Sequence, residues 1–125
     1  MINSPFRTGL LPVLYHGTRY PLQLLRANTI QIPTSGYQMV SLTRDPRVAT
    51  YWASLLRDDD EGAGAVLVLD RNKLRTRYRI SPFRDEAWHQ GVSRSAKDEA
   101  EEIIVGKPIK SLHEILIEVR WLRAS

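Results

Sequence analysis

The segment YQMVSLTRDPRVATYWASLL, residues 37–56, decides the fold class because a strand pattern changes into a helix pattern within it. Residues 37–43 have the composition of a strand. Asp45 then has the position of an N-cap, and Pro46 lies just inside the expected helix. The apolar side chains that follow recur at helical spacing: Val48, Ala49, Trp52, Leu55 and Leu56. The segment therefore predicts a strand that leads directly into a helix.

Upstream of this segment, the chain predicts a strand, a short helix and a second strand. Residues 10–16 have strand character, with Pro12 near the start, where a missing N–H is tolerated. Residues 20–27 carry a leucine stripe behind Pro21 and predict a helix. Residues 28–32 alternate polar and apolar side chains, as a half-buried strand does.

Downstream, the wholly apolar run AVLVL at residues 65–69 predicts a central strand. Residues 70–74 fit one helical turn, and we expect further strands at residues 78–80, 102–105 and 115–119. The last of these extends toward Trp121 and follows a turn around Ser111.

Basic residues alternate between Arg71 and Arg79. Their spacing predicts a solvated strand face, and the sharper alternative is a strip that binds nucleic acid or a diphosphate.

The order of these elements predicts an α+β fold, because several short strands are combined with only two convincing helices. The 125 residues suit one domain, residues 1–125, in which residues 1–11 form a loose N-terminal arm. Residues 84–97 are polar and without period, so we expect a long surface loop there. Loops of that kind often carry function.

The composition excludes several classes of chemistry. The chain has no cysteine, so thiolate catalysis, disulfides and cysteine-bound metals are ruled out. His16, His89 and His113 do not have metal-ligand spacing, and we expect no metal. No apolar run approaches membrane-spanning length and the start lacks a signal-peptide pattern, so we expect a cytoplasmic protein without a membrane partner. The net charge of +4 fits a solubilising surface better than a polyanion-binding one.

Three segments, taken in order, resemble the conserved blocks of ADP-ribosyltransferases. Residues 14–18 (LYHGT) are similar to the His-Gly-Thr strand of the poly(ADP-ribose) polymerase and diphtheria-toxin branch. Residues 40–44 (VSLTR), continuing into residues 49–51 (ATY), resemble the block in which a strand precedes a tyrosine-bearing helix. Residues 101–105 (EEIIV) are similar to the strand that begins with the catalytic glutamate. The resemblance implies a split β-sheet with two short helices around an NAD cleft.

The resemblance also implies roles for individual residues. Glu102 would be the catalytic acid, because a carboxylate beside the ribose stabilises the positive charge that develops when the nicotinamide–ribose bond breaks. Tyr51 would stack on the nicotinamide ring. The remaining NAD contacts would be His16 at the adenosine-side ribose, the Gly17 backbone at the carboxamide, Ser41 or Thr43 at the nicotinamide ribose, and Thr18 and Arg44 at the ribose and pyrophosphate.

Some alternatives stay open from the residues themselves. Glu101 and Glu102 are adjacent and would face opposite sides of a strand, and only the resemblance selects Glu102. Tyr51 beside Trp52 also fits a core aromatic. Val40 stands where the polymerase branch has an aromatic residue, and the Ser41-x-Thr43 pair is closer to the arginine-modifying branch. The motifs therefore leave the acceptor undefined.

The expected function is that of an NAD-dependent mono-ADP-ribosyltransferase acting on a protein or nucleic-acid acceptor, and its small size suits a toxin or phage effector in a host cytoplasm. Two alternatives use the same fold, an NAD glycohydrolase and a tRNA 2′-phosphotransferase-like enzyme. A non-catalytic binding module and a small basic nucleic-acid binder are the alternatives of other classes.

Overall fold

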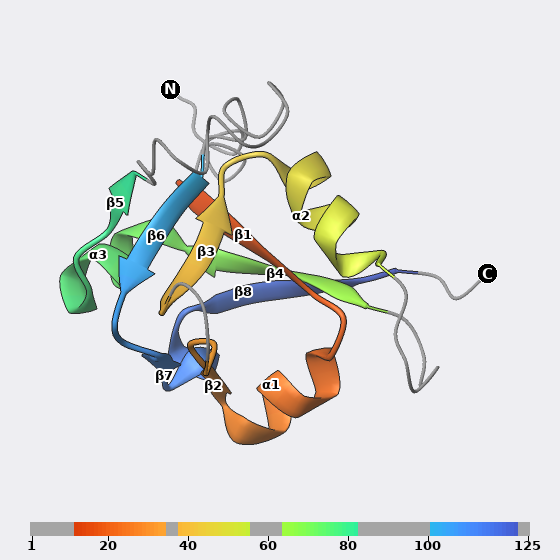
Figure 1. Ribbon diagram of the computed structural model, residues 1–125, viewed down its shortest axis with the longest axis horizontal. Coiled ribbons are helices and arrows are strands. Elements are labelled where there is room, and N and C mark those ends of the chain that lie inside the picture. Colours follow the sequence, from red (N-terminus) through yellow and green to blue (C-terminus); the bar gives the residue numbers. More distant parts are fainter. Residues whose placement is uncertain (1–11, 35–37, 56–63, 83–100, 123–125) are drawn as a thin grey trace, which may run out of the picture.

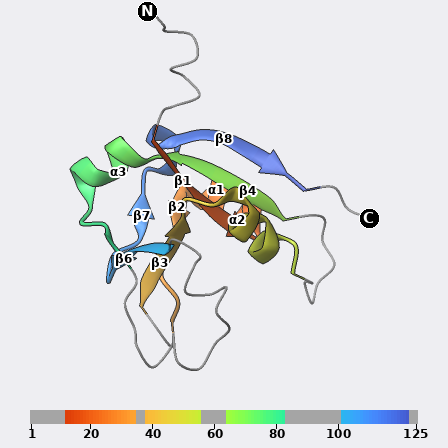
Figure 2. The same cartoon turned by 90° about the horizontal axis from the view of Figure 1, so that it is seen from above.

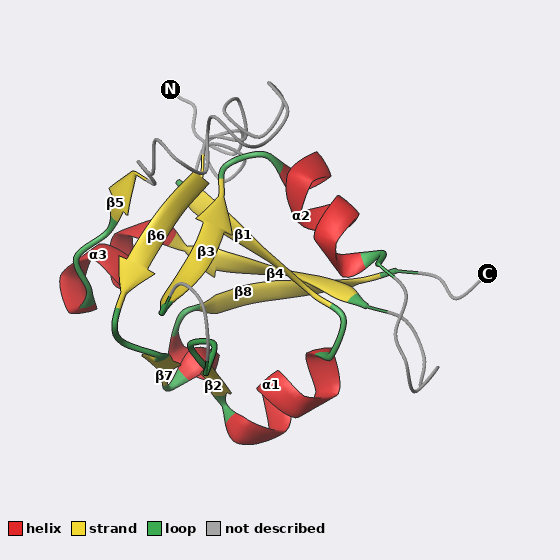
Figure 3. Cartoon of the chain, in the orientation of Figure 1, coloured by secondary structure: helices red, strands yellow, loops and turns green. Residues whose placement is uncertain are grey.

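A computed structural model describes residues 12–34, 38–55, 64–82 and 101–122 of the chain. Six of the strands form one sheet in the order β5-β6-β3-β1-β4-β8, and two short strands, β2 and β7, pair separately. All the pairings are antiparallel. The helices lie around the periphery of the sheet (Figure 1; Figure 3). The architecture is α+β, as expected.

The elements follow one another along the chain in this order: β1 (Val13–Thr18), α1 (Pro21–Ala27), β2 (Thr29–Ile30), β3 (Met39–Thr43), α2 (Pro46–Ala53), β4 (Ala65–Asp70), α3 (Arg71–Arg77), β5 (Ser81–Pro82), β6 (Glu101–Val105), β7 (Ile109–Lys110), the 3₁₀ turn η2 (Leu112–Glu114) and β8 (Leu116–Trp121).

The sheet changes direction between β1 and β3. β1 pairs with β4 along its whole length, from Val13 opposite Asp70 to Thr18 opposite Ala65. Within the described residues, the register of β1 with β3 is a single pair, Tyr15 opposite Thr43. β3 and β6 consequently lie at a steep angle to the antiparallel pair β4 and β8 (Figure 1). The angle between these two pairs of strands is also seen from above (Figure 2). We call the boundary formed by residues 16–17 of β1 and residues 41–42 of β3 the seam.

One face of the sheet, the core face, carries the main hydrophobic core. Leu14, Leu67 and Leu69 of β1 and β4 are fully buried there, as the apolar run in β4 predicted. The core extends across the seam to Val40 and Leu42 of β3. Further buried members come from the other elements around this face: Ile30, Leu74, Ile104, Ile109, Leu112 and Ile115.

The opposite face is covered by α2, and we call it the α2 face. Asp45 caps the helix by accepting a hydrogen bond from Arg47 N at 2.9 Å, as the sequence predicted. Ala49 packs on the backbone of Gly17, where an added Cβ would lie 2.0 Å from the Ala49 carbonyl oxygen. Gly64 meets Ala53 equally closely. The helix can lie directly on β1 and the start of β4 because each contact involves a glycine and an alanine.

The structure corrects the expectation for residues 70–80. The described residues contain three α-helices rather than two, since α3 continues through Arg77. The basic residues 71, 73, 75 and 77 are therefore on a helix and not on a strand face. Residues 78–80 are not a strand, and the next strand is the two-residue β5. The expected N-terminal arm and the loop at residues 84–97 lie outside the described residues.

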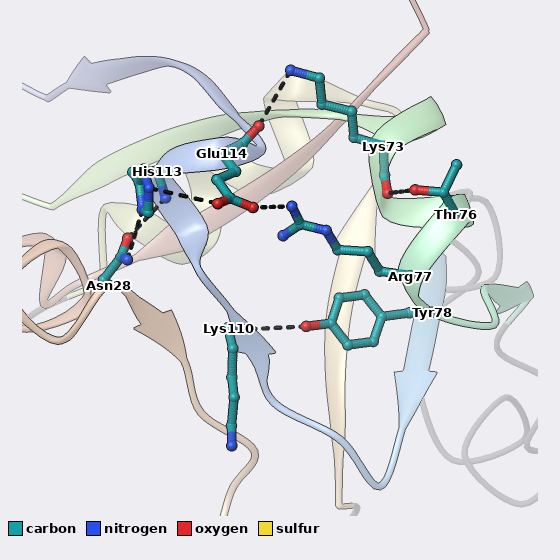
Figure 4. A network of polar contacts seen from close by, with 8 residues as sticks. All are labelled: Asn28, Lys73, Thr76, Arg77, Tyr78, Lys110, His113 and Glu114. Atoms are coloured by element: carbon teal, nitrogen blue, oxygen red, sulfur yellow. Dashed lines mark hydrogen bonds and ion pairs between the residues drawn. The ribbon is translucent and has the colours of Figure 1, made fainter.

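Polar contacts join the end of α1, the turn η2 and α3 (Figure 4). Asn28 has a left-handed backbone conformation with φ 55°, and its Oδ1 accepts a hydrogen bond from His113 N at 2.8 Å. Arg77 forms an ion pair with Glu114, and the Tyr78 hydroxyl accepts from Lys110 N at 3.0 Å. These contacts hold α1, α3, β7 and η2 together beside the hydrophobic core.

No helix in the described part of the chain is long and apolar enough to span a membrane.

Candidate functional site

His16 lies at the seam and joins its two sides. Its Nδ1 donates a hydrogen bond to the Ser41 carbonyl oxygen of β3 at 3.0 Å. His16 follows Tyr15, whose pairing with Thr43 is the one described backbone pair between β1 and β3. The side chain of His16 therefore adds a contact between the two strands next to that pair. His16 is opposite Leu67 in β4, which places it on the core face.

The protonation of His16 follows from this environment. Burial lowers the pKa of His16 below its ordinary value of 6.5, and the hydrogen bond to the Ser41 carbonyl opposes that effect. The imidazole is therefore neutral at pH 7. Because a carbonyl oxygen can only accept, the proton is on Nδ1, which leaves Nε2 with a lone pair. Nε2 can accept a hydrogen bond from a hydroxyl group, such as that of a ribose.

Glu102 is a buried carboxylate near the start of β6. It lies opposite Leu42 of β3, on the same face as Leu42, and its side chain is 8% exposed. Arg71 Nε donates to Oε1 at 3.1 Å. Arg44 Nε donates to Oε2 at 2.7 Å, and a second nitrogen of Arg44 also contacts Oε2. Two arginines therefore compensate a charge that would be costly to bury alone.

His16 and Glu102 share the core face. Leu42 is next to Thr43 in β3, and Thr43 pairs with Tyr15, so alternation places Leu42 and His16 on the same side of the sheet. Glu102 joins them through its pairing with Leu42. His16 and Glu102 are thus brought to one side of the sheet, on the strands that flank β3. Thr18, two residues after His16 in β1, shares this face. The side chain of Glu101 lies outside the described part of the chain.

The serine and threonine residues expected to contact NAD have other positions or partners in the structure. Ser41 and Thr43 alternate with Leu42 and therefore belong to the α2 face. Thr43 Oγ1 accepts a hydrogen bond from Asp45 N at 3.0 Å, in the turn that leads into α2. Thr18 Oγ1 accepts from Tyr20 N at 3.0 Å, in the turn that leads into α1. Both threonines therefore stabilise turns in this structure.

Tyr51 lies on the far side of α2 from the sheet. Ala49 and Ala53 face the sheet, and Tyr51, between them, is 58% exposed. Its ring contacts Trp52 edge-on, with 5.2 Å between centroids. Tyr51 is therefore neither a core aromatic nor on the face that carries His16 and Glu102. Its stacking on nicotinamide remains a prediction from the resemblance.

The side chains around His16 and Glu102 include acceptors and cationic donors. In the described residues, no group of three or more histidine, aspartate or glutamate side chains is positioned to hold a metal. On the core face, His16 at the seam offers a neutral imidazole acceptor, and Glu102 on β6 offers a carboxylate with two guanidinium groups bound to it. Hydroxyl groups and phosphates are the ligand groups that these side chains bind.

The sequence reasoning missed Arg71 as a site residue. It stands directly after the central strand in a run of basic residues, and nothing local distinguishes it from Arg75 or Arg77. The one usable signal was Asp70, which caps α3 by accepting from Lys73 N at 3.0 Å and so makes Arg71 the first helical residue.

No protein-family model, curated protein or solved structure matches the chain. The geometry of the core face around His16 and Glu102, together with the three motifs, carries the functional proposal.

Proposed function

We propose that the protein is an NAD-dependent mono-ADP-ribosyltransferase that breaks the nicotinamide–ribose bond and transfers ADP-ribose to a macromolecular acceptor in the cytoplasm. The observation that carries the proposal is that His16 and Glu102 lie on one face of the sheet, on the strands on either side of β3. The resemblance implies a split sheet around an NAD site, and the change of strand direction between β1 and β3 supports this part of the proposal.

The contacts with NAD would be divided among individual residues in the following way. Nε2 of His16 accepts a hydrogen bond from the adenosine-side ribose, and the Gly17 backbone binds the carboxamide. Glu102 accepts a hydrogen bond from the nicotinamide ribose and stabilises the oxocarbenium character of the transition state. Arg44, which contacts Glu102, and Thr18 would supply further ribose and pyrophosphate contacts. The resemblance also assigns NAD contacts to Ser41, Thr43 and Tyr51, but these residues do not lie on the face that carries His16 and Glu102, so the proposal does not depend on them.

The test is nicotinamide release from NAD, measured on the purified protein with and without cell lysate. Glu102→Gln is nearly isosteric and removes the negative charge, so release and transfer of labelled ADP-ribose should both fall by about 100-fold or more. Glu118→Gln is the matched control, because Glu118 is an exposed glutamate that pairs with Arg120 on β8. Activity that survives Glu102→Gln would remove Glu102 from the mechanism.

The same assay separates two of the alternatives. Nicotinamide released equally well without lysate, with no labelled acceptor, would identify an NAD glycohydrolase. NAD binding with no release by the wild-type protein would identify a non-catalytic binding module.

A second candidate, a tRNA 2′-phosphotransferase-like enzyme, is favoured by one observation. Arg44 and Arg71 both converge on Glu102, and paired guanidinium groups are suited to binding a phosphate. An RNA oligonucleotide with an internal 2′-phosphate tests it. Loss of that phosphate in the presence of NAD would favour this candidate over protein modification.

A further inference from the structure

The carboxylate of Glu102 has two arginine partners that differ in exposure and in attachment. We infer that Arg71 is a positioning residue that fixes Glu102, and that Arg44 is a cover that an anionic ligand draws away from the carboxylate. The kinetic part of this inference rests on the proposed function, whereas the exchange of Arg44 does not.

Arg71 is the fixed partner. Its side chain is 23% exposed, and its backbone N donates to the Pro12 carbonyl oxygen at 3.1 Å, which ties the start of α3 to the residue before β1. Its guanidinium spans the carboxylate, with Nε 3.1 Å from Oε1 and Nη2 3.5 Å from Oε2 of Glu102. Such a two-point contact between a planar guanidinium group and a carboxylate fixes both the position and the orientation of the carboxylate.

Arg44 is the exposed partner. Its side chain is 60% exposed, yet it contacts Oε2 of a carboxylate that is itself only 8% exposed. It comes from the turn between β3 and α2, where its neighbour Asp45 is engaged with Arg47. A ligand that approaches Oε2 from solvent must therefore displace Arg44, whereas Arg71 can stay in place.

The charges favour such an exchange. Among the described side chains, two guanidinium groups face one carboxylate, so the cluster of Arg44, Arg71 and Glu102 carries one positive charge in excess. A diphosphate is doubly negative and offers several acceptor oxygens, so it competes for the more exposed guanidinium. Arg44 then neutralises the diphosphate while Oε2 becomes available to a ribose hydroxyl. Binding of the anionic part of the ligand would in this way uncover the carboxylate.

The first experiment needs no catalytic activity. In ¹H–¹⁵N spectra of the intact protein, the arginine Nε–H signals are assigned with Arg44→Lys, Arg71→Lys and Arg47→Lys, and ADP-ribose is added as the probe. We expect the Arg44 signal to shift and the Arg71 signal to stay. Arg47 is the internal control, since it is also exposed and bound to a carboxylate, at 2.9 Å from Asp45. A shift confined to Arg71, equal shifts for Arg44 and Arg47, or no shift at all would overturn the inference.

The second experiment separates positioning from binding. Arg71→Lys keeps the charge but loses the two-point contact, so kcat for nicotinamide release should fall by about 100-fold while KM for NAD changes little. Arg71→Gln should fall further, so that lysine rescues part of the rate. Arg44→Lys should chiefly raise KM. An equal loss of kcat in the lysine variants of Arg44 and Arg71 would contradict the division of roles. A wild-type protein without nicotinamide release would refute the proposed function and leave the spectra to decide the exchange.

Discussion

His16 Nδ1 lies 3.0 Å from the Ser41 carbonyl oxygen and connects β1 to β3 immediately beyond their one described backbone pair. The imidazole thus adds a side-chain hydrogen bond between β1 and β3 at the position where the strands change direction. Burial favours the neutral form of His16, and the hydrogen bond to Ser41, which the cation could also donate, opposes this effect only in part. The stability of the seam should therefore depend on pH.

We expect the free energy of unfolding to fall as the pH drops below 6.5, the ordinary pKa of histidine. Burial lowers the pKa of His16 in the folded state, so in this range the unfolded chain binds more protons. The contribution of neutral His16 to the free energy of unfolding is complete above pH 6.5. It is lost as the pH falls toward the lowered pKa, by at most about 1.4 kcal/mol per pH unit. Urea unfolding at about pH 7.5 and about pH 5.5 measures it.

His16→Gln provides the comparison, because an amide N–H can still donate to Ser41 while no titrating group remains. The difference in unfolding free energy between the two pH values should be smaller in this variant than in the wild-type protein. An unchanged difference would show that His16 does not cause the pH dependence.

Gly17→Ala should destabilise the protein through the α2 contact. The added Cβ would lie 2.0 Å from the Ala49 carbonyl oxygen, a backbone atom that cannot move without the helix. We expect a loss of about 3 kcal/mol in unfolding free energy, at the upper end of what overpacking costs.

Gly106→Ala is the control for Gly17→Ala. Gly106 has φ 75° and open space around its Cβ position, so alanine there is strained but meets no clash. Its loss should be only about 1 kcal/mol. If the two variants lose equal stability, the close approach of α2 to β1 is not what requires a glycine at position 17.

The unequal partners of Glu102 should also differ in their effect on stability. Of the described partners of the buried carboxylate, Arg71→Met leaves the exposed Arg44, and we expect a loss of about 2 to 3 kcal/mol. Arg44→Met removes a largely exposed partner and should lose about 1 kcal/mol or less. Chemical denaturation of both variants measures the two losses, and a larger loss for Arg44→Met would contradict the order.

Local sequence patterns were sufficient to predict the helices and strands whose own residues show a clear apolar or capping pattern. The apolar run 65–69 predicted the central strand β4, and Asp45 with Pro46 predicted the start of α2. α3 was underestimated because Leu74 is its one buried residue, so its basic residues showed no helical apolar period. A short amphipathic helix with a single core contact resembles an alternating strand when only the sequence is available.

The site could be predicted only in part, for a different reason. Glu102 was selected through a motif, but its partners are 58 and 31 residues away in the chain, at Arg44 and Arg71. Pairing over such separations depends on sheet order, which no local pattern encodes. The same holds for Gly17, whose close contact with Ala49 arises only when α2 folds back onto β1.

The left-handed residue at the end of α1 allows a final prediction. Asn28 has φ 55°, its Oδ1 accepts from His113 N at 2.8 Å, and its backbone oxygen accepts from Leu112 N at 3.0 Å (Figure 4). Asn28→Ala combines a strained backbone with the loss of the side-chain hydrogen bonds, for about 2 kcal/mol of unfolding free energy.

Asn28→Gly removes the same hydrogen bonds but has no steric penalty at positive φ, so it should lose about 1 kcal/mol. Asn28→Asp keeps an acceptor for His113 N and tolerates the left-handed conformation, so its loss should be the smallest of the three. Thermal and urea unfolding of the series would establish the order. If glycine proves as damaging as alanine, the left-handed backbone conformation does not add to the loss, which then comes from the side-chain contact with His113.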